Sequence, residues 1–378
     1  MTAASGHERG SLLSLQVLRA LAALAVTLDH IVGYEFTRQY GLPDALPRFD
    51  IGNAGVDLFF VISGFVMVYA SERFYRQPRA PLEFFLRRLA RIVPLYWITT
   101  SIILIYLLIQ YRDLARANFS LESVVASYLF IPWLQIDGYM APVHGVGWTL
   151  NYEMFFYSCF CFALLFSRRT GVVLLSVALL ALVSLNQLWP MPLPLGYWAA
   201  PIILEFVFGM LIALGLRAGL RVPSPLAACI VVLGVLALAA SDRWGMGGLS
   251  RIVVWGVPCA GIVGALALAD STAKPGPMWR TLSLLGDASY SLYLLHPLAI
   301  TLPRRLFPHF VNPATSPWLY AALLLAMAVG AAVLGHLLFE RPVTRFLQRR
   351  ITSAFHGDRR AAAADLQPLG EQRADIRP

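Results

Sequence analysis

Long apolar segments, each almost free of charge, follow one another through most of this 378-residue sequence. About 20 apolar residues are needed for a helix to cross the hydrocarbon core of a bilayer, where every backbone group must be hydrogen-bonded internally. Charged residues make up 13% of the chain, against about 25% in soluble domains. We therefore predict an all-α, polytopic integral membrane protein with about ten transmembrane helices. The predicted spans are residues 11–33, 51–71, 92–111, 145–166, 171–189, 198–217, 225–241, 250–269, 282–302 and 318–339.

The links between these spans are short except for one loop, residues 112–144. Within it, residues 123–136 are apolar but too few to cross a bilayer comfortably, so we expect an interfacial or re-entrant piece. The last residues contain few apolar side chains, which is typical of disorder. We divide the chain into an N-terminal segment (1–10), a transmembrane domain (11–346) and a disordered tail (347–378).

Basic residues predict the orientation, because cytoplasmic loops are enriched in arginine and lysine. With the N-terminus inside, 21 of the 30 basic residues fall in cytoplasmic segments and eight in outer segments. This bias predicts an even number of spans and both termini in the cytoplasm.

The net charge of +9 does not indicate nucleic-acid binding, because the arginines lie between apolar spans and in the tail. That placement fits membrane topology and anionic lipids better. All four cysteines fall in apolar spans, and Cys159 and Cys161 are two apart and do not face each other on a helix. We expect neither a disulfide nor a metal site. The first apolar segment contains Arg19, Asp29 and His30, so it reads as a retained span rather than a cleaved signal.

Arg19 and His30 are the first candidate site residues. They are eleven positions apart, which places both side chains on one helical face about 16 Å apart along the axis. Ionisable groups within a membrane usually face the bundle interior and usually have a function. A permanent cation and a titratable base on one face suggest a site that binds an anion at one end and moves a proton at the other.

Two carboxylates lie within other apolar spans. Asp57 is the only charge in its span, and it could pair with Arg19, orient His30, line a cavity or form a structural hydrogen bond in the bundle. The small residues Ser63 and Gly64 follow it and allow close helix packing. Glu153 is the only ionisable residue in its apolar run, and Arg19 or His30 is its obvious partner.

A pair of arginines precedes the third predicted span. Arg88 and Arg91 are three apart and so share a helical face at the inner membrane surface. Guanidinium groups bind phosphates bidentately, although arginines in this position are also common as topology signals. We expect Pro94 to break or kink the helix just beyond them.

The ninth span contains Ser289, Tyr293 and His296, whose spacing allows all three to share a face. This face could line the site of an acceptor substrate, or His296 could be a hydrogen-bonded histidine at a helix end. Glu340 and Arg341 close the last span, where we expect a helix end fixed by their ion pair.

Taken together, these segments resemble acyltransferase family 3, the membrane-bound O-acyltransferases of bacterial surface polysaccharides, and most of all its ExoZ-type exopolysaccharide-production members. Six motifs occur in the family's order. They are Arg19 and His30 with ten residues between them, GVDLFFVISGF (55–65), RLARIVPLYW (88–97), GWTLNYEMFFY (147–157), SYSLYLLHP (289–297) and Glu340-Arg341-Pro342. The resemblance covers residues 11–346. The chain differs from the longer lipopolysaccharide-modifying members, because too few residues follow to form their hydrolase-like extension.

The resemblance implies an acyl-CoA donor bound from the cytoplasm, with acetyl-CoA as the family default and succinyl as an alternative. It implies a sugar or lipid-linked oligosaccharide as acceptor, a place in the bacterial inner membrane and contact with polysaccharide synthesis machinery. His30 would be the catalytic histidine, as general base or acyl-carrying nucleophile, with Asp57 or Glu153 as its orienting carboxylate. Arg19, Arg88 and Arg91 would bind the donor.

Two other functions fit the same residues. A transporter of an anionic metabolite or polysaccharide unit would use the buried charges as a binding or proton-relay site, although the sequence has no convincing internal repeat. A non-catalytic scaffold of a polysaccharide synthesis complex would need none of them.

Overall fold

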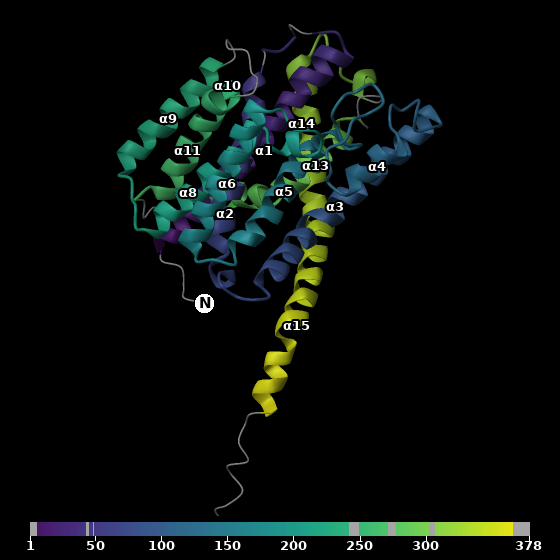
Figure 1. The fold of residues 1–378 in the computed structure, drawn as a ribbon. Coiled ribbons are helices and arrows are strands. Elements are labelled where there is room, and N and C mark those ends of the chain that lie inside the picture. The colour runs from purple at the N-terminus through teal and green to yellow at the C-terminus, as the bar shows by residue number, and fades with distance from the viewer. Residues whose placement is uncertain are drawn as a thin grey trace, which may run out of the picture.

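The computed structural model describes residues 6–42, 45–47, 49–241, 249–270, 277–301 and 307–365. Within these ranges every extended regular element is a helix, as predicted, and Figure 1 shows them gathered into one bundle. Residues 1–5 of the predicted N-terminal segment and 366–378 of the predicted tail lie outside the described residues. The α-helices are α1 (Gly6–Asp29), α2 (Ala54–Ala70), α3 (Ala80–Tyr111), α4 (Leu121–Tyr128), α5 (Trp148–Ala163), α6 (Arg168–Leu188), α7 (Leu195–Trp198), α8 (Leu204–Arg217), α9 (Ser224–Ala240), α10 (Leu249–Arg251), α11 (Val257–Leu268), α12 (Pro277–Asp287), α13 (Ser289–Thr301), α14 (Pro317–Gly335) and α15 (Arg341–Asp365).

Five helical stretches in the described part of the chain are long and apolar enough to cross a membrane. Two shorter apolar helices, Ser224–Ala240 and Ile252–Leu268, accompany them. The count of ten spans and the cytoplasmic location of both termini remain predictions. The five stretches are Leu13–Gln39, Ile51–Ala70, Ala80–Tyr111, Arg168–Leu188 and Pro317–His356.

Helix α2 packs against α1, α8 and α11. Its approach to α8 is very close at two glycines. A Cβ atom on Gly64 would lie 2.1 Å from the carbonyl oxygen of Phe206, and one on Gly209 would lie 1.9 Å from that of Val61. Small residues permit such backbone contact between apolar helices. The close packing predicted for the Ser63-Gly64 pair is therefore confirmed at Gly64.

Helix α3 starts earlier than the predicted span, and of the two effects predicted for Pro94, a break or a kink, the break does not occur. The helix runs from Ala80 to Tyr111 with Pro94 inside it. Proline is tolerated in apolar helices where neighbouring groups supply hydrogen bonds. The missing N–H of Pro94 frees the carbonyl oxygen of Ala90, and two residues further along the helix the Tyr290 hydroxyl donates to the carbonyl oxygen of Ile92 at 2.7 Å. The two arginines Arg88 and Arg91 thus belong to the continuous helix rather than to a preceding loop.

The end of the chain is more helical than predicted. Helix α14 passes through a π-helical segment, His336–Glu340, into α15, which continues to Asp365 and extends well below the bundle in Figure 1. The structure therefore describes a helix as far as residue 365, in the part of the chain where the sequence predicts disorder from residue 347. The start of α15 packs on α3, where the Arg87 guanidinium donates to the Thr352 hydroxyl at 2.8 Å.

The long loop contains one short helix, α4, capped at its start by the Ser120 side chain. At eight residues it is too short to cross a bilayer. Its apolar side chains Leu121 and Val125 are exposed, which agrees with an interfacial position. In Figure 1, α4 lies beside the upper end of α3, at the edge of the bundle.

Candidate functional site

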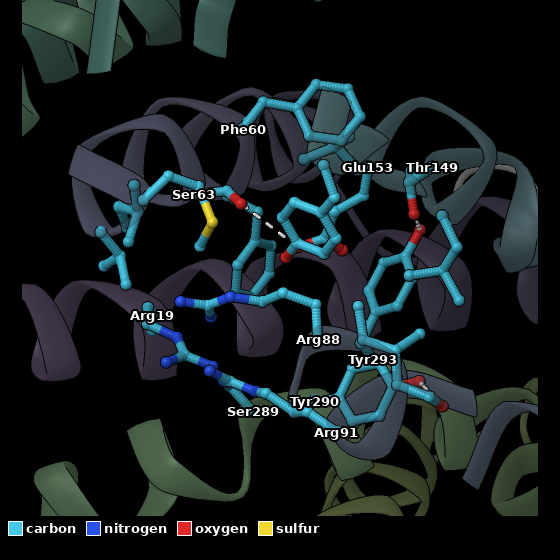
Figure 2. A pocket seen from close by; sticks show the side chains of 18 residues that line it. Arg19, Phe60, Ser63, Arg88, Arg91, Thr149, Glu153, Ser289, Tyr290 and Tyr293 are labelled. Atoms are coloured by element: carbon cyan, nitrogen blue, oxygen red, sulfur yellow. Dashed lines mark hydrogen bonds between the residues drawn. The ribbon is translucent and has the colours of Figure 1, made fainter. Parts of the chain in front are cut away.

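Helices α1, α2, α3, α5 and α13 line a cavity of about 770 Å³, counted with the space at its open mouth. Helix α2 supplies most of the apolar wall, while the other four helices supply most of the polar groups (Figure 2). The lining residues are Arg19, Val56, Phe59, Phe60, Ile62, Ser63, Val66, Met67, Arg88, Arg91, Ile92, Thr149, Leu150, Glu153, Tyr157, Ser289, Tyr290 and Tyr293.

All three arginines predicted to bind the donor line this cavity. Figure 2 shows the guanidinium groups of Arg19, Arg88 and Arg91 close together on one side of it. Arg19 donates to the Ser289 hydroxyl at 3.0 Å, and the Arg88 guanidinium lies 5.2 Å from the centre of the Phe84 ring. The sequence placed two of these residues in one segment and the third in another. Their convergence comes from the packing of α1 beside α13 and of α13 beside α3.

Glu153 is the one carboxylate among the 18 described residues that line the cavity. One of its oxygens accepts hydrogen bonds from Ser63, at 3.2 Å, and from the Tyr157 hydroxyl. The donors to this oxygen are therefore not Arg19 or His30, the partners expected from the sequence. Three guanidinium groups against one carboxylate give the wall a net positive charge, which suits a ligand with several negative charges.

His30 lies beyond the cavity, at the point where α1 changes to a π-helix, His30–Gln39. π-helical turns are frequent at functional sites. The Nδ1 atom of His30 is 2.9 Å from the carbonyl oxygen of Val26. Because a carbonyl oxygen can only accept, we assign the ring hydrogen to Nδ1, which leaves the lone pair of the neutral ring on Nε2.

The acceptor-side residues divide between the cavity and His30. Ser289 binds Arg19 and so belongs to the arginine end. Tyr293 lines the cavity, and its hydroxyl donates to the Val146 carbonyl oxygen at 2.9 Å. His296 lies next to His30, with 4.8 Å between the ring centres and 70° between the ring planes. The Tyr293 ring centre is 6.1 Å from that of His296, so Tyr293 connects the cavity with the histidine pair.

Asp57 forms an ion pair that the sequence analysis did not identify. Its two oxygens accept hydrogen bonds from Arg251, at 3.1 and 2.7 Å, and its side chain is fully buried. The Arg251 guanidinium also lies 4.6 Å from the centre of the Trp255 ring. Of the roles predicted for Asp57, this geometry fits a structural hydrogen bond inside the bundle rather than a pair with Arg19. The sequence signal for Arg251 is a single cation at the edge of the apolar span predicted for residues 250–269.

Two further residues differ from expectation or were missed. Glu340 accepts hydrogen bonds from Ser291, at 2.6 Å, and from His336, at 2.9 Å, so the predicted pair with Arg341 is not the contact that holds it.

His144, in the long loop, is buried, and its Nε2 donates to the carbonyl oxygen of Leu294 at 3.0 Å. Nothing in its local sequence indicated that this loop folds back against α13.

Comparison with known proteins agrees with the resemblance. The family model described as an acyltransferase domain matches residues 12–337. The chain is 37% identical to the exopolysaccharide production protein ExoZ of Rhizobium meliloti (strain 1021), over 82% of this chain and 95% of that protein. It is 28% identical to the acyltransferase MdmB of Streptomyces mycarofaciens, over 89% of this chain and 92% of that protein. No solved structure matches. With six motifs in order, a family model across most of the chain and an exopolysaccharide-production relative over nearly its whole length, the chain belongs to acyltransferase family 3.

Proposed function

We propose that this protein is a membrane O-acyltransferase that moves an acyl group, by default acetyl, from acyl-CoA to a sugar hydroxyl of an exopolysaccharide or another cell-surface glycan. The observation that carries the proposal is the cavity with three converging guanidinium groups, next to a histidine pair reached through Tyr293. The family and the ExoZ relative support the reaction class and the glycan acceptor.

The donor is proposed to bind by its phosphates to Arg19, Arg88 and Arg91. Guanidinium groups bind phosphate oxygens in pairs and keep their charge when buried. From Arg19 to His30 the rise along α1 is about 16 Å, a distance that an extended pantetheine arm can span. The carboxylate of Glu153 offsets one of the three arginine charges, so the cavity wall keeps a net positive charge.

His30 is proposed to act through Nε2. As a general base, it takes the proton of the sugar hydroxyl while the hydroxyl oxygen attacks the thioester carbonyl. The C–S bond then breaks, and His30 returns the proton to the thiolate. In the alternative, Nε2 attacks the thioester carbonyl first, and the C–S bond breaks so that CoA leaves as the thiolate. The sugar hydroxyl then takes the acyl group from His30, and its proton passes to the thiolate. Rapid quenching of protein with labelled donor and no acceptor separates the two, because only the second path labels the His30 peptide.

We place the protein in the bacterial inner membrane as a multi-pass protein, near the polysaccharide synthesis machinery, with anionic lipids around its basic loops. The test is the acyl content of cell-surface polysaccharide, measured by proton NMR and mass spectrometry. A deletion strain is complemented with wild type or with His30→Ala. We expect an O-acyl signal that disappears in the deletion strain and returns with wild type only. An unchanged acyl pattern in all strains would remove surface polysaccharide as the acceptor and favour a transporter.

A further inference from the structure

His296 has a buried nitrogen that no described residue satisfies. Its side chain is fully buried, its Nδ1 lies 3.0 Å from the carbonyl oxygen of Leu292, and its Nε2 has no hydrogen-bond partner. A buried polar atom without a partner is costly. Most buried polar atoms in proteins are hydrogen-bonded to protein or to ordered water, so this nitrogen requires an explanation.

The neighbouring groups do not fill this role. By the argument used for His30, the Nδ1 atom of His296 donates to a carbonyl, so Nε2 presents a lone pair and needs a donor. The Tyr293 hydroxyl already donates to Val146, and the Nε2 atom of His144 donates to Leu294. His30 faces His296 edge to face and has its own lone pair on Nε2.

Two imidazoles in contact thus present two acceptor nitrogens, and their Nδ1 hydrogens are both committed to carbonyl oxygens. A site of this kind fits a ligand that brings two donors. A sugar brings them when two of its hydroxyl groups are close together on one edge of the ring.

Resting on the proposed function, we propose that the acceptor is recognised as a diol. The hydroxyl that becomes acylated donates to His30 Nε2, and a neighbouring hydroxyl of the same sugar donates to His296 Nε2. The second hydroxyl does not react. It orients the first one toward the thioester and stabilises the pair of histidines in their neutral forms.

The test combines a change in the protein with a change in the acceptor. Membrane vesicles containing the full chain receive labelled acetyl-CoA and methyl β-D-glucopyranoside, methyl β-D-galactopyranoside or methyl α-D-mannopyranoside. The acylated position is mapped by NMR, and the best glycoside is compared with its monodeoxy analogue that lacks the adjacent hydroxyl. The variant His296→Asn keeps an amide donor for the Leu292 carbonyl oxygen but has no acceptor at the position of Nε2. The longer side chain of His296→Gln places an amide oxygen near that position, where it can accept a hydrogen bond.

We expect the monodeoxy analogue to lower kcat/KM of the wild type by about tenfold, the effect of one lost hydrogen bond to a buried group. His296→Asn should lower kcat/KM for the parent glycoside by a similar factor and leave the monodeoxy analogue almost unchanged. His296→Gln should recover part of the loss. This coupling is specific to contact between His296 and the second hydroxyl.

Other outcomes separate the two proposals. If His296→Asn slows both acceptors equally, His296 acts through His30 or through folding, and recognition of a diol is wrong. The same holds if the wild type does not distinguish the two glycosides. If the wild type acylates no glycoside in the panel and deletion leaves cell-surface acylation unchanged, the proposed function itself fails.

Discussion

Charged side chains inside the apolar bundle are held by residues on other helices. The spacing of Arg88 and Arg91, and of Arg19 and His30, places each pair on one face of its own helix. The contacts of Asp57 with Arg251 and of Glu153 with Ser63 join helices that are far apart in the sequence. Periodicity within one helix says nothing about which helices become neighbours, so these pairs required the structure.

Replacing Arg88 or Arg91 by Ala should weaken acyl-CoA binding by about tenfold to a hundredfold, because each removes a charge-assisted hydrogen bond to phosphate. Binding to purified protein is measured by calorimetry. Arg87→Ala is the matched control on the same helix, because Arg87 pairs with Glu83 and Thr352 instead of lining the cavity. Equal losses in all three variants would mean that the arginines act on folding rather than on the donor.

The Asp57–Arg251 pair makes a separate prediction. Asp57→Asn removes the carboxylate that the Arg251 guanidinium contacts and should destabilise the protein by on the order of 3 kcal/mol, seen as a lower melting temperature in detergent. The double variant Asp57→Leu with Arg251→Met should recover much of that stability, because replacing a buried ion pair by apolar groups is often neutral. Lost turnover at an unchanged melting temperature would instead restore a catalytic role for Asp57.

At the scale of helices, apolar runs predicted the middle of each element better than its ends. The first turns of α3 contain four arginines between Arg79 and Arg91 when its N-cap is included, so hydropathy began the span at residue 92, while hydrogen bonding begins the helix at Ala80. In the same way, α15 is polar and was predicted as disordered, yet its first turns pack on α3. A polar helix that packs on the outside of a bundle has no apolar run in its sequence, so hydropathy does not predict it.

Contact between α2 and α8 depends on Gly64. Gly64→Ala should lower the stability by roughly 1–3 kcal/mol, because the new Cβ atom would lie 2.1 Å from the Phe206 carbonyl oxygen and must push the helices apart. Thermal unfolding in detergent measures this change. Gly330→Ala in α14 is the control, since a Cβ atom there would have no neighbour within 4 Å. A similar melting temperature for both variants would show that α2 and α8 can separate without cost.

Across the whole molecule, the family and the all-helical architecture could be predicted from the sequence, because six short motifs and the long apolar runs are local properties. The side of the membrane on which the arginine cavity opens follows only from the bias of basic residues. That bias predicts that the segment between α2 and α3 is cytoplasmic and that the long loop after α3 lies outside.

This orientation can be measured with single cysteines in a variant that lacks the four native ones. Gln77→Cys and Tyr139→Cys both lie at exposed positions, in these two segments respectively. A membrane-impermeant maleimide should label Tyr139→Cys in intact spheroplasts and Gln77→Cys only after the membrane is permeabilised. The reverse pattern would invert the predicted topology and place the arginines at the outer surface.

The position of the three arginines has a consequence for control of the proposed reaction. In the proposed complex they would contact the part of the donor that the chemistry leaves unchanged, with the thioester about 16 Å away by the rise of α1. Free CoA should therefore bind almost as tightly as acyl-CoA and act as a competitive product inhibitor. The rate of glycan acylation would then follow the ratio of acylated to free CoA in the cell, so that decoration of the surface reports the metabolic supply of acyl groups.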